Sequence, residues 1–485
     1  MKKNKIALAI TALATATLVG CGGDSDDVSF NTATFNPRNL HYTYPLDNQQ
    51  QVAPRTIVAL QFSHEVTADA GNFSFTGPDD EDVAFTLESV ADGKGVVLTP
   101  VDALEPASDY KVVMNGVTVL GETTTFKDGT LNFTTRAALQ GPVETQKTAA
   151  NFEVESLFPD DQQFESMDFS TFRLRTSHPI ERSTVVYGDT VSLSKDGELV
   201  DAQMLVSRNA ISVDPIEDMT PGATYELSVN GIKSVFGEDI APYTHTTVPQ
   251  DTTSPTTGER AVLVTNAPPA DDTLGCRDEG VRVSDLTGQP INCVPVNSTL
   301  LQDKTVSKQQ GDVYAELAFT PNFPEITPLR VKKGGILKGD SLEVLIGGEV
   351  PVGFDSGEVT VQIISDATGY LFPNPNADSD EAPKQLRLFM DVAFSTKDAR
   401  ANGAFTQNLL HLELVGSGLI TDGKLNTDAI TIVEPRVLGV DNAYGVLSFR
   451  MESYRDQETA PLPPIDAENP FVPVLDGENG QELSW

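Results

Sequence analysis

The sequence is poor in several residues on which binding and catalytic sites often depend. Its 485 residues include one tryptophan, three cysteines and five histidines. A single tryptophan excludes a carbohydrate-binding platform built from stacked tryptophan rings. Lys and Arg number 33 against 70 Asp and Glu, and the resulting net charge of −37 repels nucleic acid and anionic lipid headgroups. We therefore expect no nucleic-acid partner, and a well-solvated surface with divalent cations as possible counterions.

The chain also lacks a hydrophobic run long enough to cross a membrane. The longest apolar segment, residues 6–19, has 14 residues, too few to span a hydrocarbon layer of about 30 Å as a helix. Lys2, Lys3 and Lys5 precede it, so residues 1–20 read as a cleavable signal peptide.

The signal peptide ends in the sequence LVGC at 18–21, which resembles the bacterial lipobox. The resemblance implies that Cys21 is acylated (palmitate among its acyl chains) and becomes the first residue of a lipid-anchored lipoprotein. Several acyl chains together hold a protein stably on a membrane. Gly22 stands where Asp would favour the inner membrane, so the resemblance implies the outer membrane. Residues 21–41 read as the lipidated cysteine and a flexible acidic tether, and whether the rest faces the periplasm or the exterior stays open.

The two remaining cysteines, Cys276 and Cys293, are predicted to form a disulfide. Exported chains meet oxidising conditions, and no histidine lies near either thiol to complete a metal site. A loop of this length would add roughly 3 kcal/mol to stability in the chain-entropy model.

Two segments of the chain repeat each other. Residues 44–66 and 158–180 match at a shift of 114, and the segments that follow match at a shift of 115. The first set of matched residues is Pro45 and Pro159, Asp47 and Asp161, Gln49 and Gln163, Leu60 and Leu174, Ser63 and Ser177, and His64 and His178. The second set is Pro100 and Pro215, Pro106 and Pro221, Tyr110 and Tyr225, Asn115 and Asn230, and Gly116 and Gly231. A shift that changes by one residue indicates two copies of one domain, at 42–136 and 153–248.

Each copy has the pattern of a β-sandwich. Val58, Leu60 and Phe62 alternate with other residues at a period of two, as do Phe172 and Leu174. Pro-containing turns lead into a strand headed by Tyr110 in the first copy and by Tyr225 in the second. A sandwich often places a corner tyrosine there, with a buried ring and a hydroxyl bonded to the backbone.

These motifs resemble the bacterial Ig-like domain of the S-layer (SbsA-like) type. The resemblance covers about 190 of the 485 residues and implies a fold and a cell-envelope habitat, not an activity. The second copy departs from the pattern, with Thr176 in place of the usual Phe and with His245 near its end.

A third region, 260–455, shows no clear repeat but has many alternating segments, and could be one large sandwich or two smaller ones. Residues 137–152 and 249–259 read as linkers, and 456–485 as an acidic, Pro-rich tail. The fold class is therefore all-β: tandem immunoglobulin-like β-sandwiches followed by a larger β-rich sandwich region.

The sequence offers few candidates for catalysis. Residues 339–342 spell GDSL, the nucleophile block of one esterase family, but no Asp stands three residues before any histidine, as that family requires. Residues 343–347 read as a strand, so the segment is a turn that leads into a strand. His64 and His178 occupy one repeat position, which favours a structural role. We assign no catalytic residue.

One loop could bind calcium. Asn374, Asn376, Asp378 and Asp380 place oxygen-bearing side chains at every second residue, and calcium takes six to eight oxygen ligands. Ser379 and Gln385 stand where an EF-hand needs Gly and Glu, so only half of such a site is present. A solvated polar loop is the alternative, and no other cofactor is expected.

The sequence therefore predicts a non-enzymatic, envelope-anchored lipoprotein whose Ig-like array acts as a spacer and an adhesion or binding module. Its partners would be the membrane, through the lipid anchor, and an unidentified protein or polysaccharide ligand. Two alternatives stay open: a surface lipoprotein that binds or processes glycans with its C-terminal region, and a periplasmic accessory subunit of an envelope complex.

Overall fold

The computed structural model describes most of the chain between residues 40 and 454. The described residues are 40–137, 139–140, 144–145, 150–256, 258, 260–265, 293–297, 305–310, 313–339, 341, 343–346, 350–376, 383–402, 409–421, 424–433 and 444–454. These residues form strands, short 3-10 turns and one short helix, α1 (Ala399–Asn402), so the predicted all-β class is confirmed. Within these ranges no helix is long and apolar enough to cross a membrane.

The first copy is a sandwich of two four-stranded sheets. One sheet has the order β1 (Leu40–Tyr44), β3 (Val58–Phe62), β7 (Gly95–Pro100) and β6 (Phe85–Val90). The other has the order β2 (Gln49–Val52), β10 (Gly129–Thr135), β8 (Asp109–Met114) and β5 (Phe73–Thr76). β4 (Val66–Thr67) pairs with β9 (Thr118–Val119) beside them.

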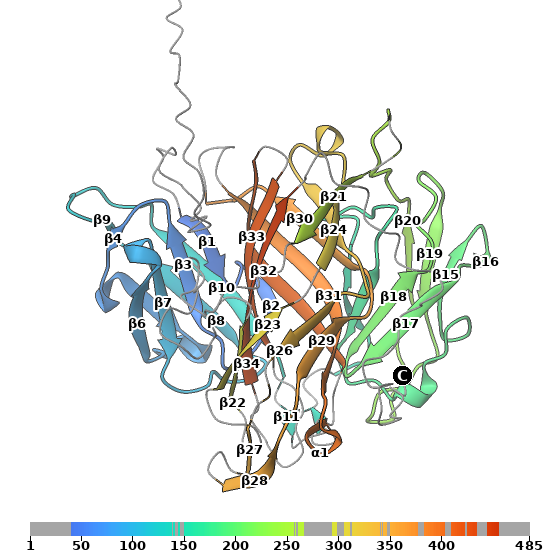
Figure 1. Ribbon diagram of the computed structural model, residues 1–485, viewed down its shortest axis with the longest axis horizontal. Helices are drawn as coiled ribbons and strands as arrows, with labels where there is room; N and C mark the ends of the chain where they lie inside the picture. The colour runs from blue at the N-terminus through green and yellow to red at the C-terminus, as the bar shows by residue number, and fades with distance from the viewer. Residues whose placement is uncertain are drawn as a thin grey trace, which may run out of the picture. The chain divides into compact units, whose positions relative to one another are not determined.

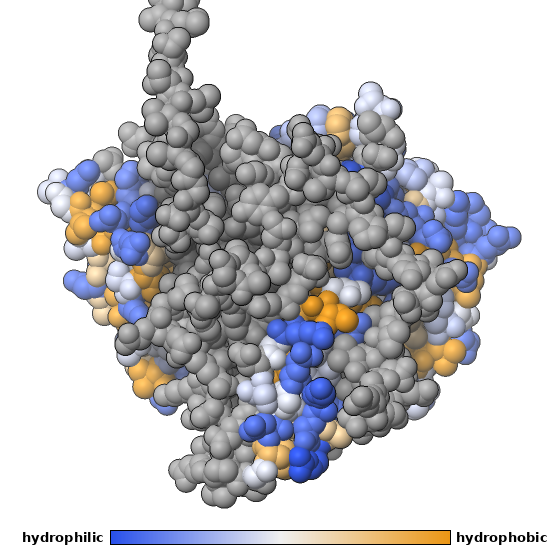
Figure 2. All heavy atoms as spheres, in the orientation of Figure 1, coloured by the Kyte–Doolittle hydropathy of each residue, from blue (hydrophilic) through white to orange (hydrophobic). Residues whose placement is uncertain are grey.

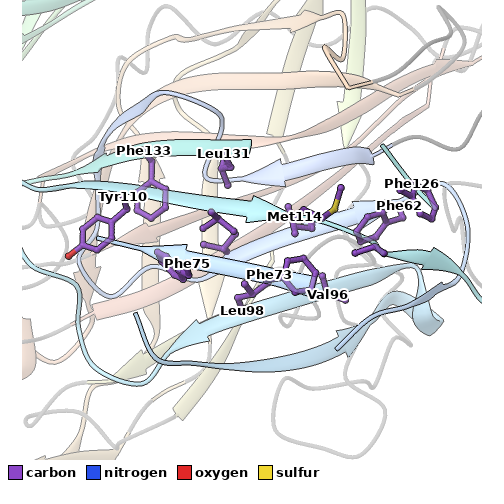
Figure 3. Packing of buried hydrophobic residues seen from close by; sticks show 14 of the residues in the cluster. Phe62, Phe73, Phe75, Val96, Leu98, Tyr110, Met114, Phe126, Leu131 and Phe133 are labelled. Carbon is purple, nitrogen blue, oxygen red and sulfur yellow. The ribbon is translucent and has the colours of Figure 1, made fainter. Parts of the chain in front are cut away.

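Aromatic side chains fill the space between these two sheets. Tyr110 and Phe133 stack with ring centroids 5.5 Å apart, and Phe75 meets Phe133 edge to face at 6.1 Å (Figure 3). Phe62 and Phe126 form a second edge-to-face pair at 4.9 Å. Such pairs add to the free energy gained by burying apolar area, and the alternation of β3 explains why Phe62 reaches this core.

The second copy repeats one sheet of the first copy strand for strand and differs at the edges of the other sheet, where β2 pairs parallel with β10 but β16 pairs antiparallel with β15. One sheet has the order β13 (Val154–Phe158), β14 (Phe172–Thr176), β18 (Ala210–Pro215) and β17 (Ala202–Ser207). The other has the order β16 (Glu198–Leu199), β15 (Val191–Lys195), β19 (Tyr225–Val229) and β20 (Tyr243–Thr247). β14 corresponds to β3: Phe172 and Leu174 enter the core, and Arg173 and Arg175 lie on the opposite face.

Both corner tyrosines take the predicted role. Tyr110 Oη accepts a hydrogen bond from Glu105 N at 2.6 Å, and Tyr225 Oη accepts one from Thr220 N at 2.9 Å. Both rings are buried. In each copy the bond spans five residues, and it closes the Pro-containing turn onto the strand that follows.

Replacing Tyr110 by phenylalanine should lower the free energy of unfolding by about 1 kcal/mol, because the hydrogen bonds between its hydroxyl and the Glu105 backbone are lost while the ring stays packed. Urea denaturation followed by circular dichroism measures the change. Tyr243→Phe is the matched control, since no hydrogen bond of the Tyr243 hydroxyl is found among the described residues and its ring is partly buried. Equal effects of the two substitutions would contradict the role given to the Tyr110 hydroxyl.

Twelve of the described strands after residue 260 form one sheet. Its order is β21 (Ala261–Thr265), β24 (Val313–Leu317), β25 (Thr327–Val331), β30 (Ala367–Phe372), β31 (Lys384–Thr396), β29 (Val359–Ile363), β26 (Ile336–Gly339), β23 (Thr305–Gln310), β22 (Cys293–Asn297), β34 (Tyr444–Tyr454), β33 (Lys424–Val433) and β32 (Leu409–Thr421). Two short pairs lie apart from it: β27 (Glu343–Ile346) with β28 (Val350–Asp355), and β11 (Leu139–Gln140) with β12 (Glu144–Thr145).

This sheet closes on itself, because β31 also pairs with β32 and β21 with β34. The 13 residues of β31 allow both β30 and β29 to share one of its edges: β30 pairs with its first half and β29 with its second half. Figure 1 shows β31, β32 and β33 as long neighbouring strands. We call this region the closed sheet.

The interior of the closed sheet is apolar. Leu386, Leu388 and Met390 of β31 pack with Leu412 and Leu414 of β32 in one buried cluster. This cluster also draws on β24, β25, β29, β30 and β33, so side chains of facing strands meet as they would in a sandwich. Since side chains alternate along a strand, the odd-numbered residues 387, 389 and 391 face outward.

The described surface is largely hydrophilic (Figure 2). Figure 2 shows hydrophilic side chains over much of the described part of one face, interrupted by separate apolar patches. The exposed large apolar residues include Val101, Leu120 and Ile216. Scattered apolar residues of this kind are ordinary on soluble proteins.

Candidate functional site

Both Ig-like copies pack against the outer face of the closed sheet, and the first copy does so through apolar contacts. Tyr42, Ile57, Ala59 and Val97 form a buried cluster with Val415 of β32. Tyr42 is fully buried, and its Oη donates a hydrogen bond to Val415 O at 3.0 Å. The sheet β1-β3-β7-β6 thus presents its outer face to β32.

The second copy also packs on the closed sheet through apolar side chains, among them Phe158 and Phe164 against Tyr370, and it adds a network of buried charges. Arg173 Nη2 donates to Asp391 Oδ2 at 3.0 Å and to Ser365 Oγ at 2.9 Å. Asp391 also contacts His411 Nδ1 and accepts a hydrogen bond from Ser212 Oγ at 3.0 Å. Burial alone would raise the pKa of Asp391, but Arg173 and His411 outweigh burial and hold it far below the usual range. The carboxylate is therefore ionised, and it pins β14 and β18 onto β31 and β32.

Ser212, His411 and Asp391 together resemble a hydrolase triad in composition but not in geometry. In a triad the two ring nitrogens of the histidine serve different partners, one the serine and one the carboxylate. Here Ser212 Oγ lies 3.2 Å from His411 Nδ1, the same nitrogen that contacts Asp391. Ser212 and Asp391 are also fully buried. This arrangement suits a structural contact and leaves the serine no route to a substrate.

A second buried group of charges lies beside the first. Lys333 Nζ binds Asp214 Oδ2 at 2.8 Å, and Lys333 N donates to Asp366 Oδ1 at 2.9 Å. Burial and the nearby Asp366 raise the pKa of Asp214. Burial opposes ionisation of Asp366 as well, but Lys332 and Arg330 lower its pKa. Asp214 and Asp366 are thus both neutralised by nearby lysine and arginine side chains where the second copy meets the closed sheet.

A third contact stacks two arginines on one ring. The guanidinium carbons of Arg260 and Arg330 lie 5.3 Å and 5.2 Å from the centroid of Phe169. Both arginines also bind Asp218, at 2.8 Å and 2.5 Å. The arginines are nearly buried but Asp218 is 39% exposed, so solvent screens these ion pairs, and they fix orientation more than they add stability.

The Ig-like copies and the outer face of the closed sheet together line a cleft of about 880 Å³. The first copy contributes residues 48–53 and 134–136, the second copy residues 153–158, 173–175 and 207–210, and β31 and β32 the floor. The charged residues in its lining are Arg136, Arg173, Arg175, Arg208 and Arg387, with Glu153, Glu155, Asp160 and Glu413. Five basic against four acidic residues reverse the ratio of the whole chain, in which acids outnumber bases by 70 to 33.

Arg175 differs from the other arginines of this cleft. Arg173 is bound to Asp391, and Arg387 Nε donates to Glu413 Oε1 at 2.6 Å. Arg175 is partly exposed to the cleft and has no hydrogen bond or ion pair among the described residues. Burial is the largest cause that lowers its pKa, Arg387 adds to that effect, and Glu413 and Glu155 oppose it. A charged side chain without a direct partner on a covered face is costly.

The residues proposed from the sequence do not gather at this cleft. Cys21 and Cys276 lie outside the described residues, while Cys293 begins β22, so the disulfide stays a prediction. Ser341 is exposed between β26 and β27, and 343–346 form the strand that the sequence predicts.

The proposed calcium loop is described only in part. Asn374 Nδ2 donates to His41 O at 2.6 Å and Leu40 O at 3.2 Å, and its Oδ1 accepts from Asn376 N. Asp378 and Asp380 lie outside the described residues. In the described part of the chain no group of three or more His, Cys, Asp or Glu could hold a metal ion. Calcium binding stays a prediction.

Sequence reasoning missed the residues of the charged interface. A signal was present: the outward positions of β14 carry Arg173 and Arg175, where the first copy has Ala59 and Gln61. The second copy thus carries two arginines at positions where the first copy carries a small residue and a neutral one. This difference indicates that the two surfaces pack against different parts of the protein.

Three comparisons relate the chain to known proteins. Residues 33–135 match the family model described as bacterial Ig-like domain, so the resemblance stated for the first copy is confirmed. Alkane uptake protein B of Marinobacter nauticus is 33% identical over 521 aligned residues, which cover 100% of this chain and 47% of that protein. The chain thus spans about half the length of this curated relative.

Solved structures of a bacterial S-layer protein are also similar. The N-terminal part of SbsC shares 12% identity at a TM-score of 0.18, covering 39% of this chain and 43% of that one. Domains 1–6 of SbsC share 11% identity at a TM-score of 0.17, covering 81% and 66%. At these TM-scores the likeness supports no inference.

Proposed function

We propose that this chain is a non-enzymatic, lipid-anchored binding protein of the bacterial outer membrane that takes part in the uptake of apolar compounds. The observation that carries the proposal is the 33% identity to alkane uptake protein B, which extends along the whole of this chain. The bacterial Ig-like domain and the lipobox at 18–21 support a place in the cell envelope.

The contacts of the Ig-like copies favour binding over a pure spacer role. A spacer needs successive domains that touch mainly their chain neighbours. Here Tyr42 of the first copy bonds to β32, and Arg173 of the second copy bonds to β31. Both copies therefore pack on the closed sheet. We propose that the cleft lined by the two copies and this sheet is the binding face.

The contacts of the polar residues that could act in catalysis support a non-enzymatic role. One histidine, one serine and one carboxylate come together in the structure: His411, Ser212 and Asp391. Their polar atoms contact one another within the interface between the second copy and the closed sheet. The GDSL segment has no histidine placed by sequence to assist Ser341.

Deleting the gene should reduce the uptake of a ¹⁴C-labelled long n-alkane several-fold in the bacterium that encodes the chain, and supplying the full chain should restore it. Uptake of labelled acetate in the same cells is the control, since acetate enters without such a protein. Alkane uptake that is unchanged by the deletion would refute the proposed role.

A further inference from the structure

A row of charges lies between the second copy and the outer face of the closed sheet, and one of its cations, Arg175, has no ion-pair partner among the described residues. Along this face Asp391 is paired with Arg173 and Glu413 with Arg387. Arg175, two residues beyond Arg173 on the same face of β14, finds no third carboxylate within bonding distance among the described residues. Within the described ranges, this strongly acidic chain thus places no carboxylate in direct contact with one arginine of the cleft, Arg175.

The repeat shows that the Ig-like fold does not require this arginine. The matched residue of the first copy is Gln61, which is buried in the same position of β3. Arg173 already provides the ion pair that holds the second copy to β31. The contact between the second copy and β31 therefore explains why residue 173 is an arginine, but it does not explain why residue 175 is one.

Arg387 supplies a second set of donors in the same cleft. Its Nε is bonded to Glu413, while its two terminal nitrogens make no hydrogen bond with the described residues. Both arginines line the same cleft, and the charge of Arg387 contributes to lowering the pKa of Arg175. An anion between them would offset that effect and accept bidentate hydrogen bonds from each fork.

Apolar groups lie next to these donors. The guanidinium carbon of Arg387 sits 5.0 Å from the centroid of the Phe389 ring, and that ring is half-buried in the floor of the cleft. Phe158, with its ring centroid 4.0 Å from that of Phe389, and Leu157 continue this lining. A cleft of about 880 Å³ is within the range of small-molecule sites, which combine apolar walls with a few polar anchors.

We propose that this cleft binds an anionic amphiphile, with Arg175 and Arg387 holding a carboxylate or phosphate headgroup and the surface around Phe389 receiving the apolar stem. The proposal rests on the function proposed above in taking the chain to be a binding protein for apolar compounds. Its test uses the purified full chain, so its failure is distinguishable from a failure of the uptake experiment in cells.

The test is calorimetric titration of the full chain with sodium decanoate, decyl phosphate, decanol and inorganic phosphate. We expect decanoate or decyl phosphate to bind, and whichever binds tighter identifies the headgroup. Decanol and inorganic phosphate should each bind at least about tenfold more weakly, because each lacks one half of the ligand. Absence of binding by both anionic amphiphiles, or equal binding of decanol, would overturn the proposal.

Arg175→Gln should weaken binding of the preferred amphiphile by about tenfold or more, whereas Arg175→Lys should retain part of it. Arg182→Gln is the matched control, because it removes the same charge from an exposed position of the same copy that does not line the cleft. Equal losses in Arg175→Gln and Arg182→Gln would overturn the assignment.

Thermal melting separates binding from folding. Since Arg175 has no ion pair with any described residue to lose, Arg175→Gln should melt at or above the temperature of the parent chain. A structural arginine predicts the opposite. A clear drop in melting temperature, together with unchanged decanoate binding by the folded variant, would show that Arg175 serves the fold and would overturn the proposal.

Discussion

Replacing Asp391 by leucine should lower the free energy of unfolding by about 3–5 kcal/mol, the range for removing one partner of a buried ion pair. The substitution leaves the Arg173 guanidinium, which is 7% exposed, without its carboxylate. It also removes the acceptor of the Ser212 hydroxyl and the partner of His411. Chemical denaturation followed by far-ultraviolet circular dichroism measures the loss.

The double variant Arg173→Met, Asp391→Leu tests the cause of this loss. Because it removes both charges together, most of the stability should return, and the difference between the single and double variants gives the coupling. Asp398→Asn is the matched control, since Asp398 pairs with Arg400 near the end of β31 in a far more exposed contact. A double variant that is as unstable as Asp391→Leu would show that the ion pair is not what Asp391 provides.

The sandwiches could be predicted because their pattern is local. Alternation at a period of two places Phe62 and Leu174 in the cores of their own sandwiches, and this does not depend on the neighbouring domains. The turn that leads to Tyr110 carries its own hydrogen bond within five residues, so a short stretch of sequence contains both partners. The repeat then transfers each assignment from one copy to the other.

The interface could not be predicted because its partners are distant along the chain. Arg173 and Asp391 are 218 residues apart, and in an alternating strand each looks like a solvent-facing polar residue. Nothing in β14 alone says that its polar face is covered by another sheet. The closure of the 12-stranded sheet is hidden for the same reason, since it depends on β21 meeting β34.

The cleft residues were missed for a related reason. Motifs such as GDSL or alternating calcium ligands have a fixed spacing, and a cleft built from three separate parts of the chain has none. A local sign of the cleft is the pair of differences between the two copies, Ala59 against Arg173 and Gln61 against Arg175.

Replacing Cys21 by serine should move the protein from the membrane fraction to the soluble fraction. In the lipid anchor that we propose, the thiol of Cys21 in the segment 18–21 would accept the lipid, and serine offers no such sulfur. Without acyl chains, a surface with a net charge of −37 is repelled by anionic headgroups rather than attracted to them. Fractionation of cells and immunoblotting measure the change, and we expect release of nearly all of the protein.

Two further variants make this prediction specific to the anchor. Cys293→Ser removes a thiol that we assign to a disulfide, so the folded protein should stay with the membrane. Gly22→Asp keeps the anchor but supplies the residue that favours the inner membrane, so the protein should change membranes and not become soluble. If Cys21→Ser remained in the outer membrane, the attachment would have to come from the folded domains. The cleft that we assign to an amphiphile would then be the first surface to test for it.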